Sequence, residues 1–116
     1  MEKDLFISEY DEEKSRVKIV LCGEIDHHSA VSLRHEIDNM LMMTRPQSLI
    51  LDLSCVDFMD SSGLGLIMGR YSLMEKLGGS MVIRNPSPRV KKILSLAGLE
   101  RVIRIENRKE TSNENK

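Results

Sequence analysis

The chain has 116 residues, with 17 basic and 18 acidic side chains and a formal net charge of −1. That balance excludes a protein that depends on general electrostatic attraction to nucleic acid or anionic lipid, and we expect neither partner. The length allows one domain with an ordinary hydrophobic core and is too short for two, and no apolar run approaches the ~20 residues of a membrane-spanning helix.

The cysteines and the start of the chain indicate the compartment. Only Cys22 and Cys55 occur, and they lack the CxxC spacing of a redox or metal motif. Residues 1–4 are charged and lack the apolar segment of a secretory signal. We therefore expect a cytoplasmic protein whose cysteines are reduced.

The first predicted elements form a hairpin. Residues 5–10 predict a short edge strand, and the polar residues 11–14 predict the connection that follows it. Every second residue from Val17 to Leu21 is apolar, which predicts a strand over residues 16–23 that ends at a glycine.

A helix and a second strand follow. Ser29 is a credible N-cap for the helix, and Pro46 predicts an end before Arg45, because the residue preceding proline disfavours helical angles. Residues 48–53 form a compact apolar segment, which is typical of a strand covered on both faces. The residues that recur along the helix at spacings of three and four are Ala30, Leu33, Arg34, Ile37, Met40 and Leu41.

The C-terminal half continues the alternation of helices and strands. In chain order the pattern predicts a helix over residues 62–77, a strand over 80–84, a helix capped by Ser87 with Pro88 first and Gly98 at its end, a strand over 99–105, and a disordered polar tail over 106–116. We therefore expect one α/β domain over residues 1–105, with three or four helices. Its four or five strands form a mixed, mostly parallel sheet with right-handed crossovers.

A serine pair marks the start of the second helix. Asp60, Ser61 and Ser62 join a buried strand to a helix N-terminus, where sites form in open α/β sheets. A serine there is either an N-cap or a phosphoacceptor whose phosphate the helix start tolerates. Both roles can coexist in adjacent serines, because one can cap the helix while the other projects.

The glycines of the same helix admit two explanations. Each costs ~1 kcal/mol relative to alanine inside a helix. Gly65 and Gly69 share one face, away from the expected core-facing stripe of Leu64, Ile67, Met68, Tyr71 and Met74. They serve either close packing of the helix on the sheet or close approach of another protein.

Other chemistries can be written from the same residues. Asp26, His27 and His28 follow the earlier strand, but neighbouring histidines rarely share one metal ion, and we expect no metal site. A small serine hydrolase using Ser61 or Ser62 lacks the GxSxG elbow. A nucleotide-binding module at the helix start is a further alternative, although the dinucleotide fingerprint is incomplete.

Four stretches match one protein family in order and spacing: GEIDHHSA at 23–30, FMDSSGLG at 58–65, GRY at 69–71, and residues 87–99. On these stretches the chain resembles the STAS-domain anti-sigma-factor antagonists. Within that family it is more similar to the sporulation members of the sigma factor F pathway than to the stress-response members.

The resemblance implies a regulatory protein that is not an enzyme and has no cofactor of its own. The unphosphorylated form is expected to bind an anti-sigma factor that is also a serine kinase carrying ATP or ADP, which frees the sporulation sigma factor. Phosphorylation of Ser61 is expected to end binding, and a PP2C-like phosphatase to restore it. The expected partner-binding residues are Glu24, Asp26, His27, Asp60, Ser61, Ser62, Gly63, Gly65 and Gly69.

Overall fold

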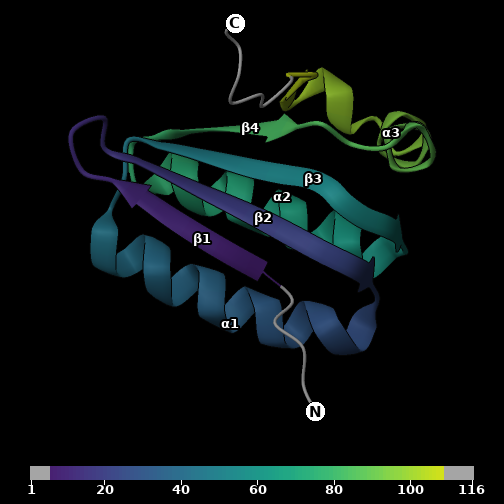
Figure 1. Cartoon of the computed structure of the whole chain (residues 1–116), viewed down its shortest axis with the longest axis horizontal. Helices are drawn as coiled ribbons and strands as arrows, with labels where there is room; N and C mark the ends of the chain where they lie inside the picture. Colours follow the sequence, from purple (N-terminus) through teal and green to yellow (C-terminus); the bar gives the residue numbers. More distant parts are fainter. Residues whose placement is uncertain (1–5, 109–116) are drawn as a thin grey trace, which may run out of the picture.

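The computed structural model describes residues 6–108. Helices α1 and α2 lie on one face of a sheet, and α3 lies beside one end of it (Figure 1). No helix among these residues is long and apolar enough to cross a membrane. The elements in chain order are β1 (Phe6–Asp11), β2 (Arg16–Ile25), α1 (His27–Thr44), β3 (Ser48–Met59), α2 (Ser61–Lys76), β4 (Ser80–Arg84), α3 (Pro88–Leu96), the 3-10 helix η1 (Leu99–Arg101) and β5 (Arg104–Glu106).

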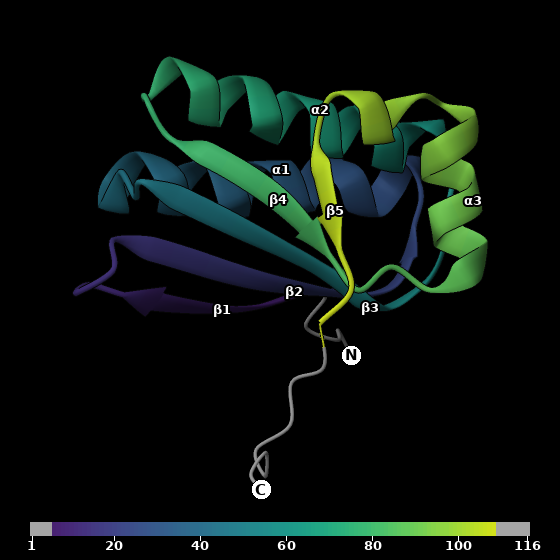
Figure 2. The same cartoon turned by 90° about the horizontal axis from the view of Figure 1, so that it is seen from above.

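Within residues 6–108, five strands form one mixed sheet in the order of the chain. β1 pairs antiparallel with β2, and all later neighbours are parallel. Parallel neighbours need crossover connections, and α1, α2 and α3 supply them. Because each crossover joins adjacent strands, α1 and α2 lie side by side over the same face, as Figure 2 shows from above. The predicted α/β class with a mostly parallel sheet is confirmed.

The core lies between the sheet and α1 and α2. Every second residue of β2 from Val17 to Leu21 is completely buried, as the alternation predicts. On α1 the buried apolar residues are spaced by four and form a narrow stripe toward the sheet. Burial of each such side chain contributes ~1.5–3 kcal/mol. The stripe residues are Leu33, Ile37 and Leu41.

The core-facing side of α2 differs from the prediction. Ile67 and Met74 are buried as expected, whereas Leu64, Met68 and Tyr71 are only half-buried at the margin of the core. The side of α2 that packs on the sheet is therefore shifted around the helix relative to the predicted stripe. Its buried residues are Gly63, Leu66, Ile67, Arg70 and Met74.

Two predicted strand ends fall short of the observed ones. β3 continues to Met59 instead of Leu53, and β2 continues to Ile25 instead of Gly23. The added part of β3 includes exposed polar residues such as Ser54, which a burial pattern does not identify as strand. The strand continues because Cys55, Val56, Phe58 and Met59 pair with β2.

The last strand, predicted over residues 99–105, is wrong as far as Ile103. Leu99 begins a short 3-10 helix, and β5 starts only at Arg104. Gly98 has φ of +79°, a conformation that glycine adopts without strain. The N–H of Ile103 then donates to the carbonyl of Leu99 at 2.9 Å, so the chain turns before it enters the sheet.

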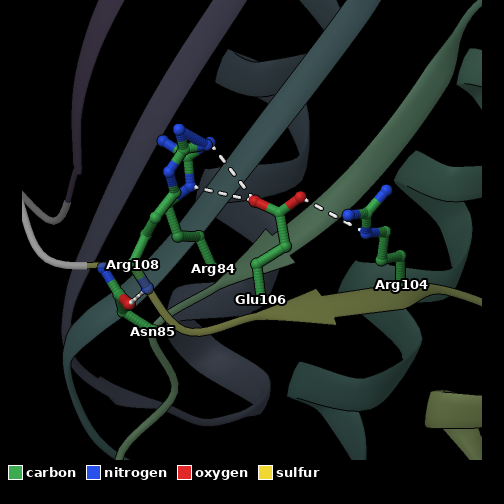
Figure 3. A network of polar contacts seen from close by, with 5 residues as sticks. All are labelled: Arg84, Asn85, Arg104, Glu106 and Arg108. Carbon is green, nitrogen blue, oxygen red and sulfur yellow. Dashed lines mark hydrogen bonds and ion pairs between the residues drawn. The ribbon is translucent and has the colours of Figure 1, made fainter.

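Polar contacts tie β5 to β4 (Figure 3). Oε1 of Glu106 accepts hydrogen bonds from Nε and Nη2 of Arg84 at 3.4 and 3.3 Å, and its Oε2 lies 3.4 Å from Nε of Arg104. Asn85 donates its N–H to the Glu106 carbonyl at 2.7 Å, and its side-chain oxygen accepts the Arg108 N–H at 2.6 Å. Glu106, the first residue of the predicted polar tail, is thus the last residue of β5. Residues 109–116 of that tail lie outside the described residues.

Candidate functional site

The ends of β2 and β3 lie next to each other, as their parallel pairing requires. Ile25 is the register partner of Met59, and the N–H of Asp60 donates to the carbonyl of Ile25 at 3.2 Å. Each strand is followed directly by a helix that begins with an aspartate N-cap, Asp26 for α1 and Asp60 for α2. The two helix N-termini, which contain Asp26 and Ser61, therefore meet at the carboxyl edge of the sheet.

Asp26, and not Ser29, is the N-cap of α1. Its Oδ1 accepts the N–H of Ser29 at 2.9 Å, and Oγ of Ser29 accepts the N–H of Asp26 at 3.0 Å. This reciprocal pair is a capping box. The hydrogen bond from the Ser29 backbone lowers the pKa of Asp26, because it favours the ionised carboxylate.

Asp60 holds the start of α2. Its Oδ1 accepts the N–H of Ser62 at 2.8 Å, so neither serine is the cap, contrary to the prediction that one of the two can be. Ser61 is the first helical residue and is exposed, whereas Ser62 is half-buried. Within the described part of the chain, the Ser61 hydroxyl has no hydrogen-bond partner. The Ser61 hydroxyl is therefore accessible at the positive end of the helix dipole.

A groove of about 490 Å³ separates α1 from α2 beside these serines. Ser62, Gly65 and Gly69 contribute from α2, and His27 and Arg34 face them from α1. We call this feature the interhelix groove. Its lining residues are His27, Ala30, Val31, Arg34, Ser62, Gly65, Leu66, Gly69 and Arg70.

The glycines of α2 have different roles. A Cβ at Gly63 would lie 2.7 Å from Cβ of Met59 and 3.3 Å from Cγ2 of Ile25. Gly63 is buried, so it serves packing and does not lie on the expected partner surface. A Cβ at Gly65 or Gly69 would meet nothing within 4 Å. These two glycines leave helix backbone open in the interhelix groove, which rules out the packing explanation for them.

Arg70 of α2 lines the interhelix groove and is buried. Its Nε lies 2.8 Å from Oδ1 of Asp38 on α1, an ion pair rather than a well-aligned hydrogen bond, and its side chain is only 7% exposed. Burial lowers the pKa of Arg70, and the neighbouring Asp38 opposes that shift. The sequence pattern gives no sign of this pair, because its members are 32 residues apart and only the fold brings them together.

Four exposed carboxylates surround the strand ends. We call them the acidic rim; they are Glu24, Asp26, Asp57 and Asp60.

A cation–π contact links β3 to the start of α3. Phe58 is the register partner of Glu24, and the guanidinium of Arg89 lies 5.7 Å from the Phe58 ring centre, within the range of such a contact. This link was also not predicted.

The geometry can be compared with the requirements of a metal site and of a serine hydrolase. Among residues 6–108, no three His, Cys, Asp or Glu side chains gather in a way that could hold a metal ion. Within the same residues no hydrogen bond joins Ser61 or Ser62 to a histidine, and Oδ1 of Asp26 is engaged by Ser29. The arrangement therefore offers an accessible hydroxyl, a groove and a charged rim rather than a catalytic triad.

Comparisons with known proteins agree with this fold. The model of the STAS domain matches residues 9–112. An anti-sigma F factor antagonist of Paenibacillus polymyxa is 38% identical over 85 residues, which are 73% of this chain and 73% of that protein. The solved structure of the anti-sigma factor antagonist SpoIIAA in its unphosphorylated form is 32% identical, with a TM-score of 0.75, over 94% of this chain and 90% of that one. The phosphorylated form of the Bacillus cell fate determinant SpoIIAA is 31% identical, with a TM-score of 0.68, over 94% of each chain.

Proposed function

The chain belongs to the STAS-domain family, and from that premise we propose that it is an anti-sigma-factor antagonist controlled by phosphorylation of Ser61. Its unphosphorylated form binds an anti-sigma factor that is also an ATP-dependent serine kinase, and this binding releases a sporulation sigma factor. The kinase then phosphorylates Ser61 and the complex dissociates. A PP2C-like phosphatase regenerates the active form, and the chain itself is a regulatory protein and not an enzyme.

The exposure of the Ser61 hydroxyl is the observation that carries this proposal. A kinase must reach the hydroxyl that it modifies, and Ser61 is exposed with its hydroxyl unoccupied among the described residues. Ser62 is half-buried at the groove, and Asp60 holds its N–H. A phosphate on the first residue of α2 is also favoured within the fold by the free N–H groups and dipole of the helix.

The partner surface that we propose consists of the interhelix groove and the acidic rim. Gly65 and Gly69 open the groove to a side chain or backbone of the partner. His27 and Ser62 lie along the same groove, and Ser61 precedes Ser62 at its edge. The anti-sigma factor therefore covers the hydroxyl that it later phosphorylates.

Phosphorylation ends binding through charge. A phosphate on Ser61 adds about −1.5 to −2 charges to a surface that already carries the acidic rim. Covering that charge requires its desolvation and brings it against partner groups that were complementary to a neutral hydroxyl. Each ~1.4 kcal/mol of this difference is tenfold in affinity, so a few kcal/mol switch the complex from bound to free.

Phosphorylation with purified components tests the proposal. The chain is incubated with its cognate anti-sigma factor and Mg-ATP, and the added phosphate is located by mass spectrometry of peptides. We expect one phosphate, on Ser61, in the natural chain and in Ser62→Ala, and none in Ser61→Ala. Phosphate on Ser62 in the natural chain would overturn the choice of residue.

Two rival functions give different results in simple assays. A small serine hydrolase would turn over ester substrates and react with serine-directed inhibitors at Ser61 or Ser62. A nucleotide-binding module would release heat on titration of the isolated chain with ATP or GTP. We expect neither signal, and either one would redirect the assignment toward the helix start as a small-molecule site.

A further inference from the structure

Cys22 and Cys55 are the only two cysteines of the chain, and the fold places them side by side. Val20 of β2 is the register partner of Asp52 on β3, but the next partner of β2, Cys22, is matched with Cys55. β3 thus contains one more residue than β2 over this stretch, which is a β-bulge. A regular ladder would have placed Ser54 opposite Cys22.

Side-chain hydrogen bonds within β3 stabilise the bulge. Oδ1 of Asp52 accepts hydrogen bonds from the N–H and the hydroxyl of Ser54, at 2.8 and 2.6 Å. Asp52 is buried, whereas both Ser54 and Cys55 are exposed. The local hydrogen bonding of Asp52 thus supports the register that brings Cys55 to its partner.

The geometry of the pair suits a covalent link. Neighbouring strands lie ~4.8 Å apart, within the range of roughly 4.4–6.8 Å that disulfides need between Cα atoms. Both thiols are free, Cys22 is half-buried and Cys55 is exposed. Burial raises the pKa of Cys22, so the exposed Cys55 is the thiol that an oxidant meets first.

We propose that Cys22 and Cys55 are a redox modification site that forms a reversible disulfide across β2 and β3. The oxidant is a low-molecular-weight disulfide such as oxidised glutathione. The Cys55 thiolate attacks one of its sulfurs and expels one glutathione thiolate, which leaves a mixed disulfide. The Cys22 thiolate then attacks the Cys55 sulfur and expels the second. In sum the two cysteines lose two protons and two electrons, and oxidised glutathione becomes two reduced molecules.

The disulfide would lie away from the interhelix groove. Leu21 is buried toward the helices, and successive side chains of a strand point to opposite faces of the sheet. The side chain of Cys22 therefore lies on the face away from the helices. The link closes the chain segment that contains α1 and fastens together the strands that lead to Asp26 and Asp60. We expect it to raise the melting temperature by several degrees without covering Ser61.

Equilibration of the full chain with mixtures of reduced and oxidised glutathione tests this inference. We expect the intrachain disulfide, detected by a mass loss of about 2 Da and a linked peptide, to be at least tenfold more populated in the folded chain than in urea at the same glutathione ratio. Cys22→Ser should stop at a glutathione adduct on Cys55, and Cys55→Ser should take up little glutathione.

Two results would overturn the inference. One is a folded natural chain that carries only glutathione adducts or intermolecular dimers at every ratio. The other is an intrachain disulfide that forms at least as readily in urea, because the fold would then contribute nothing to the pairing. Both readouts use the natural chain, so the inference remains testable even if a cysteine variant folds poorly.

Discussion

The N–H of Asp60 donates a hydrogen bond to the carbonyl oxygen of Ile25, across 3.2 Å. This contact joins Asp60, the N-cap that follows β3, to the last residue of β2, and it sets the two helix N-termini side by side. The position of Ser61 therefore depends on a paired sheet edge and not on a loose loop. Charge placed on Ser61 acts at a defined point beside the interhelix groove.

The charge at Ser61 predicts opposite results for two substitutions. Ser61→Ala removes the phosphoacceptor and leaves the surface neutral, so we expect binding to the anti-sigma factor within about threefold of the natural chain. Ser61→Glu places a negative charge at the same point and should weaken binding tenfold or more. Calorimetric titration measures both. Equal affinities for the two variants would remove charge as the cause of switching.

The fold of the phosphorylated chain should be unchanged. The cap on α2 is Asp60, and the Ser61 hydroxyl holds no partner among the described residues, so a phosphate there breaks no contact. We expect backbone amide NMR shifts to change only near the start of α2 and along the interhelix groove. Widespread changes in β4 or β5 would instead indicate a rearrangement of the sheet.

The glycines of α2 predict stability effects of opposite sign. Gly65→Ala and Gly69→Ala should each raise the free energy of unfolding by ~0.5–1 kcal/mol, because alanine favours the helix and its Cβ meets no neighbour. Gly63→Ala should lower it by ~1–3 kcal/mol, because its Cβ would lie 2.7 Å from Cβ of Met59. Urea unfolding measures all three. A loss of stability at Gly65 would show that the groove is not open there.

A larger side chain in the same groove separates stability from binding. Gly65→Met keeps the helix but fills the space between α1 and α2, so we expect a similar melting temperature and binding weakened tenfold or more. Lys91→Met, on α3 away from the groove, is the matched control. Unchanged affinity of Gly65→Met would place the anti-sigma factor on another surface.

The sequence predicts those elements whose signals are local. The alternation from Val17 to Leu21 identifies β2 because the sheet has one buried face, and Ser87 before Pro88 marks the start of α3 as observed. The start of α1 is ambiguous in the sequence. Asp26 and Ser29 form the two positions of a capping box, and both are residue types that serve as N-caps. The structure decides for Asp26, because β2 runs up to the residue before it.

Other features depend on partners distant in the sequence. The extension of β3 through Cys55 has no burial pattern and exists only because β2 pairs with it. An arginine among apolar residues suggests an exposed position, yet Arg70 is buried because Asp38 of the adjacent helix meets it. The position of the serine pair directly after a predicted strand identifies it from the sequence. The only sequence signal for the groove beside it is that Gly65 and Gly69 share one face of the helix.

The pair of Arg70 and Asp38 predicts a sizeable loss of stability when one member is removed. Asp38→Ala leaves a buried guanidinium without its carboxylate, and we expect the free energy of unfolding to fall by about 2 kcal/mol. The effect is smaller than for a fully buried pair because the Asp38 side chain is 34% exposed. Arg34→Ala, an exposed arginine of the same groove, should change stability by less than ~0.5 kcal/mol. Equal losses in the two variants would show that the pair is not stabilising.

The N-cap of α1 predicts a dependence of stability on pH. The folded pKa of Asp26 is lowered by its hydrogen bond from Ser29, so its ionised form stabilises the fold. That contribution is complete above the unfolded pKa of about 3.9 and is lost as the pH falls through the lower folded pKa. Asp26→Asn keeps a capping oxygen without the charge. In urea unfolding, the natural chain should exceed Asp26→Asn in stability at pH 7, and the difference should shrink below about pH 4.

Asp26→Ser separates capping from charge in the same series. Serine also accepts the backbone hydrogen bond and does not titrate, so the difference between Asp26→Ser and Asp26→Asn should stay constant from pH 7 to pH 3. Only the natural chain should converge on the variants in acid. A difference between the natural chain and Asp26→Asn that persists unchanged to pH 3 would contradict the assignment, because the stabilisation would then come from the shape of the cap and not from its charge.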